Sequence, residues 1–109
     1  MKAFAFNPVD YIMRDYLVNV NHFPSVFGTD VSGVVEAVGS DLQEKEPSWK
    51  KGLRVLAFAP SFEMKGDPDY GGMQEFVKVP SCNVTPIPDS LSFTDAGNFN
   101  SLPMSIIYN

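Results

Sequence analysis

The side chains that most often bind metals or act as nucleophiles are scarce in this sequence. Cys82 and His22 are the one cysteine and the one histidine among the 109 residues, and they lie far apart in the chain. Catalytic zinc takes three protein ligands and structural zinc four, mostly from cysteine and histidine. A zinc site would need two or more carboxylates with no recognisable spacing, so we predict no metal site.

Nucleophilic and acid-base sites are equally hard to assemble. A Ser-His-Asp arrangement would have to use His22, and no carboxylate stands at a spacing that would orient its imidazole. We therefore expect His22 to be a loop residue. Cys82, between Ser81 and Asn83, is typical of a small, half-buried apolar residue and not of a nucleophile.

The glycine-rich stretch 23–39, FPSVFGTDVSGVVEAVG, predicts a strand and not a phosphate site. A phosphate-binding turn needs G-x-G-x-x-G, or G-x-x-x-x-G followed by Lys and Ser or Thr, and Gly28, Gly33 and Gly39 are spaced differently. Residues 31–38 predict a central strand, with positions 31, 33, 35 and 37 packed and the alternate positions half solvated. Gly33 in its middle indicates a bulge, a bend or a close backbone approach.

Length and charge favour a single domain with a modest core. Eight basic and thirteen acidic residues give a net charge of −5, and without a basic patch we expect no nucleic acid partner. No apolar run approaches the ~20 residues that span a bilayer, and the amino end lacks the pattern of a signal peptide. One cysteine allows no internal disulfide, which suits a reducing compartment. We expect a soluble, cytoplasmic chain with no membrane partner.

Turn residues and apolar patterns divide the rest of the chain into short elements. Alternation predicts strands over 2–6, 53–59 and 75–79. Asn7 and Pro8 predict a helix through about residue 15, whose inward positions would be Val9, Ile12 and Met13. Ser92 or Thr94 could cap a helix from near residue 95, and residues 102–108 could begin another.

The remaining segments are predicted to be loops or extended chain. Residues 41–51 carry charges of both signs and predict a solvated loop, which Trp49 would anchor to the body of the domain. Residues 60–72 form a long segment rich in Gly, Pro and Asp, and such loops tend to be functional or mobile. Residues 85–89, T-P-I-P-D, should be stiff and extended.

Several motifs together carry a family resemblance. They are N-P-V-D-Y at 7–11, the stretch 23–39, G-L-R-V at 52–55, G-G-M-Q-E-F at 71–76, V-P at 79–80 and I-P-D at 87–89. In this order the chain resembles, over residues 2–108, the GroES-like catalytic domain of the medium-chain dehydrogenase/reductase superfamily, in particular its zinc-independent quinone oxidoreductase and enoyl reductase branch. The resemblance implies a mainly β, partly open GroES-like β-barrel with short peripheral helices that lacks its first strands. Residues 1–109 would form a single incomplete catalytic domain, without the Rossmann cofactor domain.

The resemblance also implies an activity and its residues. It implies hydride transfer from NADPH to an enone, quinone, enoyl or carbonyl substrate without zinc, because Thr29 stands where zinc-dependent relatives carry a histidine. Asn7 and Asp10 would shape the cofactor cleft near the nicotinamide, and Tyr11 would be the catalytic group that lines the pocket or donates a hydrogen bond. Tyr108 stands about where many relatives carry a threonine near the nicotinamide. Asn7 could equally be a plain helix cap, and Asp10 a first-turn acid favoured by the helix dipole.

Two features of the chain limit these expectations. Ile12 and Met13 stand where family members often carry a lysine, and no glycine-rich turn for a pyrophosphate is present. The family's NADP site lies between two domains, so we expect the chain alone to be inactive, its substrate to be a small molecule, and any oligomer to form through the missing cofactor domain. The alternative is a non-catalytic, stand-alone barrel remnant or interaction module. A co-chaperonin function would rest on the fold name alone.

Overall fold

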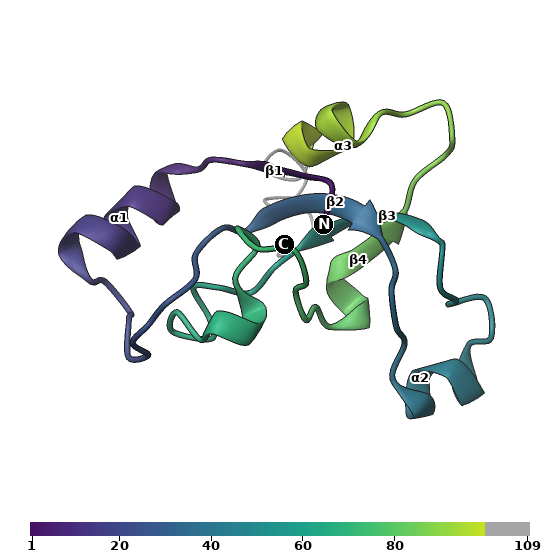
Figure 1. The fold of residues 1–109 in the computed structure, drawn as a ribbon, viewed down its shortest axis with the longest axis horizontal. Helices are drawn as coiled ribbons and strands as arrows, with labels where there is room; N and C mark the ends of the chain where they lie inside the picture. The colour runs from purple at the N-terminus through teal and green to yellow at the C-terminus, as the bar shows by residue number, and fades with distance from the viewer. Residues whose placement is uncertain (100–109) are drawn as a thin grey trace, which may run out of the picture.

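The computed structural model describes residues 1–99, which are built around a four-stranded antiparallel sheet (Figure 1). The strands are β1 (Ala3–Ala5), β2 (Asp30–Val34), β3 (Arg54–Phe58) and β4 (Val84–Pro86). Each strand pairs with the next one along the chain, and within the described residues β1 and β4 do not pair with each other. The sheet is therefore open, and it agrees in outline with the predicted mainly β fold.

The centre of the sheet carries a small apolar core. Val31 pairs with Phe4 on one side and with Ala57 on the other, and Val31, Ala57 and Ala59 are buried together. Met1, Val77, Val79 and Val84 pack against this cluster, which is made mostly of small side chains.

Within residues 1–99, three α-helices and two short 3₁₀ helices surround the sheet. They are α1 (Pro8–Tyr16), α2 (Ser40–Lys45), η1 (Pro68–Tyr70), η2 (Ser81–Asn83) and α3 (Phe93–Phe99). Helix α3 lies against β1, β2 and β3 (Figure 1). It has the predicted cap, because the amide of Asp95 donates to Ser92 Oγ over 3.1 Å. In α1, Met13 is buried and Val9 and Ile12 are partly buried, as predicted.

Strand β2 differs from its prediction in length and in burial. It ends at Val34 and not at residue 38, since the chain turns away toward α2 after Val35 bonds to Leu53. Ser32, expected on a half-solvated face, is 1% exposed because α3 covers it, and its hydroxyl donates to the carbonyl oxygen of Phe93 over 2.5 Å. The prediction at Gly33 is confirmed as a close backbone approach: a Cβ there would lie 3.0 Å from Met1 Cα.

The predicted strand at 75–79 was wrong. These residues form no ladder with the sheet, and the position beside β3 belongs to β4, within the region predicted only as stiff and extended. Helix α2 was also missed, because the mixed charges of residues 40–45 indicated only a solvated loop.

The predictions for residues outside the strands agree with the structure only in part. Cys82 is exposed and not half buried, because it lies in the one-turn helix η2 at the surface. The indole of Trp49 donates to Glu46 over 2.9 Å, so its hydrogen bond stays within its own loop. His22 is an exposed loop residue, as predicted. Residues 60–72 form a loop, as predicted, which consists of successive turns and η1.

Some predictions fall outside what the structure describes. The helix predicted at 102–108 and Tyr108 lie beyond residue 99. Within residues 1–99, no helix is long and apolar enough to cross a membrane.

Candidate functional site

Two loops hold the region where α1 meets the sheet. The amides of Gly72 and Met73 donate to the carbonyl oxygens of Gly28 and Phe27, each over 2.9 Å. These bonds fix the chain that enters β2, and they place residues 28–30 beside the first turn of α1.

A buried polar cluster joins α1 to this entry. The backbone amide of Asn7 donates to Asp10 Oδ2 over 2.8 Å, and the amide of Gly28 donates to Asp10 Oδ1 over 3.1 Å. The side-chain amide of Asn7 donates to Asp30 Oδ2 over 2.8 Å and to Thr29 Oγ1 over 3.3 Å. The N-P-V-D motif therefore links α1 to the sheet through hydrogen bonds. Asn7 donates to this network with both its backbone amide and its side-chain amide.

The two carboxylates of this cluster are almost completely buried. Asp10 is 6% exposed and Asp30 is 2% exposed. Burial raises the pKa of Asp10, and the hydrogen bonds from the amides of Asn7 and Gly28 offset part of this shift. Burial also raises the pKa of Asp30, the hydrogen bond from Asn7 lowers it, and the negative charge of Asp10 raises it further.

Tyr11 is placed quite differently from its neighbour Asp10. Successive helical residues are rotated by about 100°, so the inward Asp10 is followed by a Tyr11 that is 51% exposed. The structure thus brings Asn7 and Asp10 together with Thr29 and Asp30, and it leaves Tyr11 on the outer side of the same helical turn. The fourth predicted residue, Tyr108, lies outside the described residues.

Asp30 was not singled out from the sequence, and Thr29 was named only because it stands where zinc-dependent relatives carry a histidine. One signal was present, since Asp30 is a charged residue directly before an apolar run, and such a carboxylate needs a hydrogen-bond donor once it is buried. The donor that Asp30 uses, Asn7, lies on another element, and sequence alone does not show which element will face the strand.

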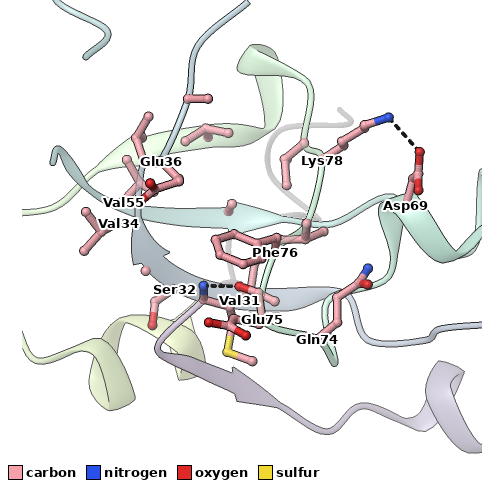
Figure 2. A pocket seen from close by; sticks show the side chains of 18 of the residues that line it. Val31, Ser32, Val34, Glu36, Val55, Asp69, Gln74, Glu75, Phe76 and Lys78 are labelled. Carbon is pink, nitrogen blue, oxygen red and sulfur yellow. Dashed lines mark hydrogen bonds and ion pairs between the residues drawn. The ribbon is translucent and has the colours of Figure 1, made fainter. Parts of the chain in front are cut away.

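The structure also has a cavity of about 580 Å³, and no residue of the polar cluster lines it (Figure 2). Its walls come from the sheet and from residues 74–79, and most of the lining side chains are apolar, including Val31, Val55 and Phe76. Among its polar side chains, Lys78 and Asp69 pair with each other over 2.6 Å, and Gln74 donates to backbone carbonyls. We regard the polar cluster and Tyr11, and not this cavity, as the place with groups suited to chemistry.

The residues at this place can act as hydrogen-bonding groups but do not resemble a metal centre. Among residues 1–99, no group of three or more His, Cys, Asp and Glu side chains is arranged to hold a metal ion. An exposed tyrosine hydroxyl can donate or accept a hydrogen bond, and Tyr11 directly follows Asp10 of the buried network.

Comparison with known proteins places this geometry in context. The sequence profile of the alcohol dehydrogenase GroES-like domain matches residues 1–89. A trans-enoyl reductase from Aspergillus terreus is 41% identical over 108 residues, which is 98% of this chain and 34% of that protein. A trans-enoyl reductase from Aspergillus flavipes is also 41% identical over 108 residues, 98% of this chain and 30% of that protein.

A more distant relative comes from a plant. The 2-methylene-furan-3-one reductase of Solanum lycopersicum is 32% identical over 106 residues, 95% of this chain and 26% of that protein. This chain thus spans about a third or less of the length of these relatives. No solved structure matches the chain significantly.

Proposed function

Because this chain belongs to the alcohol dehydrogenase GroES-like domain family, within the medium-chain dehydrogenase/reductase superfamily, we propose that it is the catalytic-domain part of an oxidoreductase that uses NADPH to reduce a carbon–carbon double bond next to a carbonyl group. The names of the relatives carry this proposal. An enoyl group and a 2-methylene-furan-3-one share that conjugated arrangement. The proposed substrate is a small molecule that contains it, an enoyl compound or an enone, with quinones as a further possibility of the same electronic type.

For this reaction the protein has to position the cofactor against the substrate and to supply hydrogen bonds. Hydride addition to the β-carbon moves negative charge onto the carbonyl oxygen, and a placed donor stabilises that charge. We assign this role to the hydroxyl of Tyr11, which is half exposed on the first turn of α1. NADPH would supply the hydride when bound, and a proton added at the α-carbon would complete the reduction.

We propose that the residues of this chain contact only the nicotinamide part of NADPH. Asn7 and Asp10, together with Tyr108 beyond the described residues, would form one wall near the nicotinamide, and Asp10 would act by fixing the wall because its carboxylate is engaged by two backbone amides. The sequence has no glycine-rich turn for the pyrophosphate. We therefore propose that a cofactor-binding domain supplies the second wall and the surface for any oligomer, that further strands complete the barrel, and that the 109 residues alone are inactive.

We also propose that the reaction proceeds in the cytoplasm without zinc. By the family resemblance, Thr29 would stand where zinc-dependent relatives carry a histidine, and its hydroxyl accepts a hydrogen bond from Asn7. The protein would therefore stabilise the developing charge with hydrogen bonds alone.

A chimeric enzyme tests the proposal. In it, this chain replaces the matching 108 residues of the Aspergillus terreus trans-enoyl reductase, and NADPH oxidation is followed with enoyl thioesters, enones and quinones. We expect turnover with enoyl or enone substrates and quenching of NADPH fluorescence on mixing, with the unaltered reductase as control. A chimera that is folded by near-ultraviolet circular dichroism but neither binds nor oxidises NADPH would contradict the proposal and favour a non-catalytic interaction module.

A further inference from the structure

Helix α1 is attached to the rest of the molecule in an unusual way. It extends from one end of the sheet (Figure 1), and it packs against loops and not against the face of the sheet that α3 covers. Met13 is the one apolar residue of α1 that is fully buried, whereas Tyr11 and Tyr16 are 51% and 73% exposed. With so little apolar contact, the direction of α1 must depend strongly on its hydrogen bonds.

The hydrogen bonds at the start of α1 differ in what they fasten. Asp10 belongs to α1 itself, and its external partner is the amide of Gly28, in the loop before β2. Asp30 belongs to the sheet, where it pairs with Ala5 on one side and with Phe58 on the other. The bond from Asn7 to Asp30 is therefore the one that ties the N-terminal cap of α1 directly to a residue held by two neighbouring strands.

We propose that Asp30 is a positioning residue, which holds Asn7 and thereby sets the direction in which the first turn of α1 presents Tyr11 to the substrate. This inference rests on the proposed function for the role of Tyr11. Asp30 is buried and does not contact the substrate, and it acts on the reaction through Asn7 and the helix. Both side chains must be present for this effect, because an acceptor without its donor would leave a buried group unsatisfied.

The geometry explains why a carboxylate or an amide is needed at position 30. Asn7 Nδ2 has two hydrogens, and Thr29 and Asp30 accept them at 3.3 and 2.8 Å. Thr29 offers the longer contact, so it can replace Asp30 only poorly. An asparagine at position 30 would keep one acceptor oxygen for Asn7, whereas an alanine would remove the acceptor.

Hydrogen exchange on the 109-residue chain tests the role of the hydrogen bond between Asn7 and Asp30 independently of catalysis. In Asp30→Ala we expect the amides of residues 11–16 to exchange at least tenfold faster, with those of β3 within twofold of the native rates. Asp30→Asn should restore most of the protection of α1. Asp41→Ala, at an exposed carboxylate on the remote helix α2, is the control and should change neither.

The same variants in the chimera test the link to Tyr11. We expect kcat to fall about tenfold in Asp30→Ala with KM within threefold, and Asp30→Asn to recover most of it. The inference would be overturned if Asp30→Ala lost protection equally in α1 and β3, or if exchange in α1 did not change. It would also be overturned if the chimera were active and its kcat were unchanged in Asp30→Ala. An inactive chimera would count against the proposed function alone, since the exchange rates would still decide whether Asp30 holds α1.

Discussion

The amide of Gly72 donates to the carbonyl oxygen of Gly28 over 2.9 Å, and this bond joins two loops that leave no room for side chains between them. A Cβ on Gly72 would overlap Val31 Cγ1, and one on Gly71 would overlap the backbone carbonyl of Val26. The glycine pair that opens the motif G-G-M-Q-E-F is therefore explained by close packing against the chain that enters β2.

Replacing Gly71 by alanine should destabilise the fold. The obstacle is a backbone carbonyl, which cannot move aside as a flexible side chain could, so we expect a loss of about 1–3 kcal/mol in the free energy of unfolding. Urea denaturation followed by circular dichroism measures it. Gly39→Ala is the matched control, because a Cβ there meets nothing within 4 Å; equal stability of the two variants would refute the packing argument.

The local features of the sheet could be predicted from the sequence, because they depend on neighbouring residues. Alternation gave strands close to β1 and β3, Asn7 and Pro8 gave the start of α1, and Ser92 gave the cap of α3. The close approach at Gly33 also followed from its place in a strand.

Features that depend on distant partners could not be predicted. Residues 75–79 have the pattern of a strand, but β4 occupies the place beside β3. Residues 75–79 therefore pair with no strand among the described residues. Ser32 is buried because α3 covers it, and its partner Phe93 lies 61 positions further along the chain. The cluster around Asn7 was found only in part, since Asp30 reaches it from another element.

Arg54 should be hard to replace even by lysine. Its guanidinium donates to the carbonyl oxygens of Pro88 and Leu91 over 3.0 and 2.7 Å, and it lies 4.4 Å from the centre of the Phe93 ring. Lysine cannot reproduce this planar fork, so we expect Arg54→Lys to lower the free energy of unfolding by about 1–2 kcal/mol.

Thermal or urea denaturation measures the effect of Arg54→Lys. Arg14→Lys is the control, because Arg14 pairs with Asp15 at the exposed surface, where ion pairs contribute little. If both lysine variants were as stable as the native chain, the fork at Arg54 would be unimportant for the path from β4 to α3.

Removing the hydroxyl of Tyr11 should reduce catalysis without unfolding the chain. Because Tyr11 is half exposed, Tyr11→Phe loses little packing, and the loss of a donor to the developing oxyanion should lower kcat/KM of the chimera by roughly 10²-fold. Tyr16→Phe, on the exposed last turn of α1, should leave kcat/KM unchanged. Unchanged kcat/KM in Tyr11→Phe would remove Tyr11 as the donor.

The buried carboxylate of Asp30 should make stability fall as pH rises. Burial, with the charge of Asp10, holds the pKa of Asp30 above its ordinary value of 3.8, so between these two pKa values the folded chain binds more protons than the unfolded chain. Stability therefore decreases as pH rises through this window. Asparagine carries no charge at any pH, so Asp30→Asn should lack this decrease.

The measurement is urea unfolding of the native chain and of Asp30→Asn from pH 3.5 to 7. Other carboxylates titrate in both proteins, and the pKa of Asp15 and Glu36 is lowered by Arg14 and Lys51, so the informative quantity is the difference between the two proteins. We expect the free energy of unfolding of the native chain to fall relative to that of Asp30→Asn as pH rises. A difference that stays constant, or that grows in favour of the native chain, would mean that the folded protein does not penalise the charge on Asp30.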